Sequence, residues 1–238
     1  MKTLPDRLIE QLNSLVSFLS LSREDVFQVL NDNRVTWFAA NQKALPAAYT
    51  TYRRQINHSA ILLGYSYFES FLVDLLTEIL RNRPAMLPRG RKVDYSEILD
   101  SPDKNALMDK LIQRELHELF YKSMEDIIKE LRERYNFTIT EEEERRFIEA
   151  SLIRNCIIHN SSRADSRLSQ QGGHPEGEEF EVSAADVHSY GLTARTLVRR
   201  MYDEAHANHG VGVEQGARPK RRPPRHRAIR RHRGGGGG

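Results

Sequence analysis

The sequence has almost none of the cysteine that disulfide-linked or cysteine-based metal domains require. Cys156 is the single cysteine among 238 residues, so the chain can form neither an intramolecular disulfide nor a cysteine-based zinc site. This usage suits a reducing compartment, and we expect a cytoplasmic protein. The length is enough for one sizeable core with an extension, so one main domain is expected.

Long hydrophobic runs are also missing. The opening residues, MKTLPDRLIEQLNS, spread charges through the region where a secretion signal would be apolar. No window elsewhere reaches the ~20 apolar residues that a membrane span requires. The sequence therefore predicts a protein that is neither secreted nor embedded in a membrane.

The common motifs of cofactor-dependent enzymes are absent as well. There is no phosphate-binding glycine loop and no HExxH zinc motif, and the glycines at 172 and 173 lack a strand–turn–helix context. His58, His117 and His188 are expected singly on polar helix faces, where no pair of them makes a convincing metal-ligand set. We expect neither a metal nor a cofactor.

What the chain does have is an uneven distribution of charge. Residues 211–238 hold nine lysines and arginines against the single Glu214, whereas residues 1–210 are mildly acidic. The stretch ARPKRRPPRHRAIRRHRGGGGG cannot form a packed core, so a disordered basic tail is expected over residues 209–238. Its charges suit phosphate backbones, and the candidate RNA-binding residues are Arg218, Lys220, Arg221 and Arg222. A shifted reading frame would give the same composition, so a natural role for the tail is left open.

Nearly every apolar pattern repeats at helical spacing, and strand signals are almost absent. This predicts an all-α protein, an antiparallel helical bundle over residues 46–208. Residues 1–45 are expected to form an N-terminal extension of two amphipathic helices, the second starting at Ser22 with Asp25. Residues 47–82, between Pro46 and Pro84, are the longest candidate helix and the expected spine of the bundle.

The later helices are marked by their starts. Loop-forming Pro, Gly and Arg fill residues 83–103, and one or two helices are expected over 103–134. Thr140 with Glu143 has the spacing of a capping box and starts the next helix.

A second start signal follows a loop. Residues 161–179 are rich in Ser, Gly and Pro and predict a mobile loop. Ser183 with Asp186 then caps a last helix that runs to about Ala207.

One stretch of the fourth helical region places three polar side chains in an apolar run: LIRNCIIHN, residues 152–160. Burying a polar group without a partner costs about 1–3 kcal/mol, so these groups need a structural partner or a chemical role. Helical geometry puts Asn155 and His159 on the core-type face, pointing inward or along a groove, and Arg154 about 140° around the helix from His159. One helix alone does not bring Arg154 and His159 together.

His159 is expected at the end of that helix, where the helix dipole favours a protonated imidazole near neutral pH. The alternative is structural. A single histidine on an apolar face is more often a hydrogen-bonded core residue, and Asn155 is then an ordinary hydrogen-bonding side chain.

An arginine, a polar residue and a histidine four residues further on, near a helix end of a small all-α chain, resemble the R-x4-6-H motif of the HEPN superfamily. Arg154, Asn155 and His159 occupy the three marked positions. The segment HSAILLGYSYFESFLVDLL at 58–76 resembles the long helix upstream of that motif in the RiboL-PSP branch. The likeness covers roughly residues 47–207 and leaves out residues 1–45 and the tail.

The resemblance implies a bundle that forms a homodimer with the two motifs facing each other, and a metal-independent endoribonuclease. Such an enzyme cuts single-stranded or looped RNA by attack of the 2′-OH and acts as a toxin or a phage-defence effector, so an antitoxin or defence partner is expected. His159 would move protons and Arg154 would stabilise charge on the phosphate. The alternative is a catalytically inactive HEPN-like interaction or nucleotide-binding module.

Glu69 is the remaining candidate, because it is a carboxylate inside the apolar centre of the long helix. It either positions Arg154 or takes part in an ordinary buried ion pair, and both interpretations stand. Tyr65 and Tyr67 are expected to be core or interface aromatics.

Overall fold

The structure is a computed structural model, and it describes residues 3–31, 45–88 and 92–212. Within these ranges the chain forms helices and no β-strand, which confirms the prediction of an all-α bundle. The elements are α1 (Leu4–Asn31), α3 (Leu45–Asn82), the 3-10 turn η2 (Pro84–Met86), α4 (Tyr95–Leu99), α5 (Lys104–Phe120), α6 (Met124–Glu133), α7 (Glu141–His159), α8 (Ser166–Gly172) and α9 (Ala184–His209).

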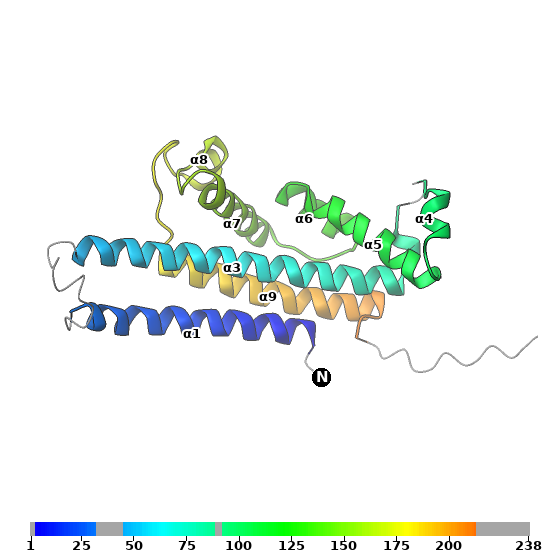
Figure 1. The fold of residues 1–238 in the computed structure, drawn as a ribbon, viewed down its shortest axis with the longest axis horizontal. Coiled ribbons are helices and arrows are strands. Elements are labelled where there is room, and N and C mark those ends of the chain that lie inside the picture. The colour runs from blue at the N-terminus through cyan, green and yellow to red at the C-terminus, as the bar shows by residue number, and fades with distance from the viewer. Residues whose placement is uncertain (1–2, 32–44, 89–91, 213–238) are drawn as a thin grey trace, which may run out of the picture.

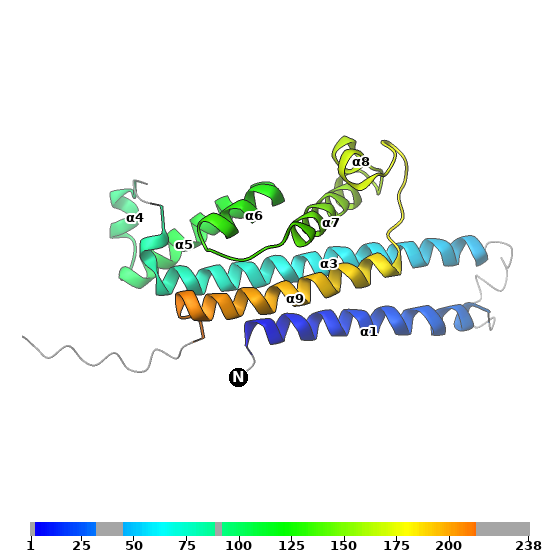
Figure 2. The same cartoon turned by 180° about the vertical axis from the view of Figure 1, so that it is seen from behind.

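Three long helices form one layer of the molecule. α1, α3 and α9 contact one another side by side, with α1 antiparallel to α3 and α9 running in the same direction as α3 (Figure 1). The shorter helices α5 to α8 lie on one side of this layer, and Figure 2 shows the same arrangement from behind. α5 and α7 pack directly on α3, and α6 and α8 pack on α7. α3 is therefore the spine, as its length predicted.

The core lies along the second half of α3. Its most buried side chains come from one continuous stretch: Leu72, Leu75, Leu76, Ile79 and Leu80, all with 0% exposure. Burying each such side chain contributes about 1.5–3 kcal/mol, so this stretch fixes how the neighbouring helices dock. The observed bounds agree with the predicted helix over residues 47–82 within two residues.

The apolar character of α3 differs from the prediction that no segment is long and apolar enough to span a membrane. The part from Pro46 to Asn82 is long and apolar enough to cross a membrane by length and composition. In the window that meets this criterion 39% of the residues are buried, and α3 packs against α1, α5, α7 and α9.

The N-terminal region differs from the two helices predicted for it. α1 is one uninterrupted helix from Leu4 to Asn31, and Ser22 and Asp25 lie within it rather than at a start. No proline or glycine occurs between Pro5 and Pro46 to break the helix, so the capping pattern alone is not sufficient. Leu8 and Leu12 are buried in the main core, which makes α1 part of the bundle packing.

Both segments that were predicted as loops contain short helical elements. Residues 83–103 include η2 and α4. Residues 161–179 include α8, whose start is capped by Asp165 through its side chain and the backbone N–H of Leu168. The predicted basic tail lies outside the described residues from 213 onward, so Arg218, Lys220, Arg221 and Arg222 have no described positions.

The predicted starts of the two longest C-terminal helices are confirmed. Thr140 and Glu143 form a complete capping box at the start of α7, and Ser183 and Asp186 form another at α9. Each box satisfies backbone N–H groups that the first helical turn leaves without partners. α9 ends at His209, two residues beyond the predicted Ala207, and Gly210 caps it in the left-handed conformation.

Candidate active site

The packing of α7 fixes the orientation of the three candidate residues. Leu152, Ile153 and Cys156 are buried in a second apolar cluster that also contains Ala60 and Ile61 of α3. Because these side chains face the spine, the polar residues between them project toward the edges of the contact. Arg154 and Asn155 are half-buried there, and His159 is exposed.

Arg154 and Asn155 line a small polar cleft, here called the arginine cleft, between α3, α6, α7 and α8. Its volume is about 100 Å³. The polar side chains that line it come from four elements and one turn: Tyr65, Glu69, Lys122, Ser123, Glu125, Ser151, Arg154, Asn155 and Arg167.

Direct contacts hold Arg154 in this cleft. Its Nη1 donates a hydrogen bond to Oδ1 of Asn155 at 2.9 Å, and its Cζ lies 5.7 Å from the centroid of the Tyr65 ring. A guanidinium over an aromatic face gains about 0.5–1 kcal/mol at exposed sites and more when desolvated. The Tyr65 hydroxyl in turn donates to Oγ of Ser151 at 3.3 Å.

Tyr65 therefore supports the arginine and also belongs to the main core, as expected for a core aromatic. Burial raises the pKa of Tyr65 to about 12, because a phenolate would be poorly solvated there. The hydroxyl stays protonated near neutral pH and keeps its role as a donor.

Glu69 faces the same cleft from α3. Burial raises the pKa of its carboxyl group, and the charge of Arg154 acts in the opposite direction. Among the described residues no direct ion pair joins Glu69 to a cation, so the ordinary buried ion pair is not formed. The positive charge of Arg154 instead acts on the Glu69 carboxyl group without a direct contact between the two side chains.

His159 lies elsewhere and does not line the arginine cleft. It is the last residue of α7, and its neighbour Ile158 is 48% exposed. The expectation that His159 points inward is not met, because the residue is exposed at the end of α7. The chain then turns through Ser161 and Ser162, both with positive φ, and the Ser162 N–H donates to the Cys156 carbonyl at 3.0 Å.

One histidine was placed wrongly from the sequence. His58 is 2% exposed rather than on a polar face, and its Nδ1 lies 3.2 Å from Oγ of Ser162. The cause is the segment after α7, which folds back over α3 so that the Asn57 side chain donates to the Val182 carbonyl at 2.8 Å. No sequence pattern near residue 58 indicates this long-range contact. His117 and His188 are exposed, as predicted.

The sequence analysis also missed several polar residues of the cleft. Ser151 lies one turn before Asn155 on the same helix face, so helical spacing alone could have identified it. Lys122 and Arg167 come from the turn before α6 and from α8, and only the tertiary fold brings them near Arg154. Arg167 pairs with Glu125 at 2.9 Å, and Lys122 pairs with Glu130.

The described residues contain no group of three His, Cys, Asp or Glu side chains arranged to hold a metal ion. The arginine cleft is thus defined by a fixed guanidinium with hydrogen-bonding neighbours. Comparisons with protein-family models, curated proteins and solved structures give no match to this chain.

Proposed function

We propose that the protein is a metal-independent endoribonuclease that cuts single-stranded or looped RNA and acts in the cytoplasm as a toxin or phage-defence effector. The observation that carries the proposal is Arg154, held beside Asn155 and against Tyr65 in a polar cleft, in a helix whose last residue is His159. These are the three positions that resemble the HEPN motif.

The chemistry requires few groups. The RNA 2′-OH attacks the adjacent phosphorus, and the bond to the 5′-oxygen breaks, which leaves a cyclic phosphate and a free 5′-hydroxyl. His159 takes or returns the protons, and Arg154 stabilises the negative charge that gathers on the phosphate oxygens. Asn155 holds the guanidinium in place through its Oδ1.

The separation of Arg154 and His159 favours a composite site in a homodimer. Within one chain Arg154 lines the cleft, while His159 is on the surface next to the exposed Ile158. A two-fold axis near the end of α7 would place His159 of one copy against Arg154 of the other. The exposed apolar Ile158 suits burial in such an interface.

The test is cleavage of a looped RNA by the full-length protein in EDTA. Cleavage should persist with the chelator, and Arg154→Ala and His159→Ala should each lose about 100-fold or more in rate. Arg145→Ala and His117→Ala are matched controls, since both side chains are exposed and lie away from the cleft. Wild-type protein that fails to cut RNA would refute the enzyme.

Mixing the two inactive variants tests the composite site. An Arg154→Ala subunit paired with a His159→Ala subunit restores one complete site per dimer if the residues act across the interface. Activity that stays absent in verified mixed dimers, or full cleavage by a monomeric species, would contradict this assembly.

The alternative is a catalytically inactive module that binds nucleotides or a defence partner. It is favoured by the exposure of His159 in the single chain and by the three cations, Lys122, Arg154 and Arg167, that line the cleft. Binding of a nucleotide without RNA cleavage, lost in Arg154→Ala, would support this alternative.

A further inference from the structure

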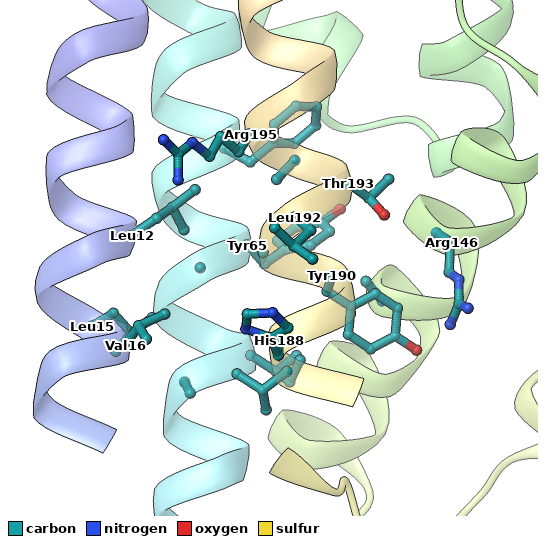
Figure 3. A pocket seen from close by; sticks show the side chains of 18 of the residues that line it. Leu12, Leu15, Val16, Tyr65, Arg146, His188, Tyr190, Leu192, Thr193 and Arg195 are labelled. Carbon is teal, nitrogen blue, oxygen red and sulfur yellow. The ribbon is translucent and has the colours of Figure 1, made fainter. Parts of the chain in front are cut away.

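A second and larger space lies on the other side of Tyr65. It has a volume of about 300 Å³ and is enclosed by α1, α3, the start of α7 and the first half of α9 (Figure 3). Its wall is mainly aliphatic and aromatic, with Leu12, Ile61, Phe68, Phe147, Val187 and Leu192 among the lining side chains. We refer to this space as the apolar cavity.

Two helical glycines lie in the wall of the apolar cavity. Gly64 of α3 and Gly191 of α9 both line it, and a Cβ built on Gly191 would meet no atom within 4 Å. Glycine inside a helix is less stable than alanine by about 0.5–1 kcal/mol, and a larger residue at 191 would occupy the empty volume. Glycine at position 191 thus leaves space in the cavity, although helix stability alone would favour a residue with a side chain there.

The cavity also has a positive charge at its edge. Arg195 of α9 is half-buried, and Figure 3 shows its guanidinium extending across α3 toward Leu12 of α1. Within the described residues it forms no hydrogen bond or ion pair. Arg146, on the α7 side, differs because its Nε donates to Glu142 at 3.1 Å and its Cζ lies 5.9 Å from the Tyr190 ring.

These features specify the chemistry of an occupant. Ligand sites are concave, are mostly apolar and carry a few placed polar groups, and their volumes begin near 300 Å³. An apolar chain would fill the space between Gly64 and Gly191, and an anionic head group would form an ion pair with Arg195 at the edge of the cavity. We propose that the apolar cavity binds a small amphipathic acid, a carboxylate on a medium-length aliphatic chain.

The test is calorimetric titration of the full-length protein with decanoate below its micelle-forming concentration, with decanol as the uncharged probe. Decanoate should bind at one site per chain and raise the Tm, because a ligand that binds only the folded state stabilises it. Arg195→Gln should weaken decanoate binding by roughly tenfold or more and leave decanol binding unchanged. Arg199→Gln is the matched control, an exposed arginine one turn further along α9.

Gly191→Leu tests the location independently of charge. The leucine side chain should fill the cavity and abolish binding of both probes, while a cooperative thermal transition shows that the variant folds. The proposal is overturned if wild type fails to bind decanoate, if Arg195→Gln binds it as tightly as wild type, or if folded Gly191→Leu still binds. Equal affinity of wild type for decanol and decanoate would overturn the anionic part of the assignment.

Discussion

Tyr65 lines both the arginine cleft and the apolar cavity, yet the two sites differ in whether their arginines have partners within the chain. In the cleft the chain supplies its own partners, such as Asn155 for Arg154 and Glu125 for Arg167. In the cavity Arg195 has no partner among the described residues. The guanidinium groups of the cleft are held in place before any ligand arrives, whereas Arg195 at the cavity is left for a ligand to bind.

The largest effect is expected when Tyr65, the side chain that lines both sites, is removed. Tyr65→Ala should lower the free energy of unfolding by about 3–5 kcal/mol, because it deletes a core aromatic and joins the two spaces. Tyr65→Phe keeps the ring and loses only the hydrogen bond to Ser151, which should cost about 0.5–1.5 kcal/mol. Urea denaturation measures both, and equal losses would show that the ring itself adds nothing to stability beyond the hydrogen bond of its hydroxyl group.

A smaller effect is expected when the uncompensated charge in the arginine cleft is removed. The pKa of Glu69 is raised in the folded protein above 4.5, so the folded state binds a proton more readily than the unfolded state. The ionised carboxylate therefore opposes folding at neutral pH, and this cost disappears as the pH falls through the folded pKa. Glu69→Gln should be more stable than wild type at pH 7.

The stability difference should shrink toward pH 4, where wild-type Glu69 is protonated. Denaturation curves at the two pH values give the comparison. Glu176→Gln, an exposed carboxylate in the segment between α8 and α9, serves as the control and should change stability by less than about 0.5 kcal/mol. A Glu69→Gln variant that is less stable at pH 7 would mean that the attraction of Arg154 outweighs burial.

The smallest effect on stability is expected for a substitution in the wall of the apolar cavity. Gly191→Ala should stabilise the protein by about 0.5–1 kcal/mol, because the new methyl group meets no atom within 4 Å and the helix gains propensity. Gly210→Ala is the contrasting variant and should lose stability, since Gly210 ends α9 with φ of +68°. Thermal unfolding resolves both signs, and a destabilised Gly191→Ala would indicate that the cavity wall closes on that residue.

The parts of the fold that follow local rules could be predicted from the sequence. The capping boxes at Thr140 and Ser183 and the long helix between Pro46 and Pro84 depend on neighbouring residues alone. The single helix α1 could not, because a Ser–Asp capping pattern is also compatible with an uninterrupted helix. The motif helix was found, but its neighbours Lys122 and Arg167 were not, since tertiary packing brings them there.

The burial of His58 has a consequence for the chain segment that follows His159. Burial lowers the pKa of His58 below 6.5, and the nearby Arg54 lowers it further, while Glu179 and Glu181 act against them. The unfolded chain then binds the proton more readily, so stability is lost as the pH falls from about 6.5 toward the folded pKa. The ring of His58 contacts the hydroxyl group of Ser162, three residues after His159. Mild acid therefore destabilises the packing of the segment after α7 on α3.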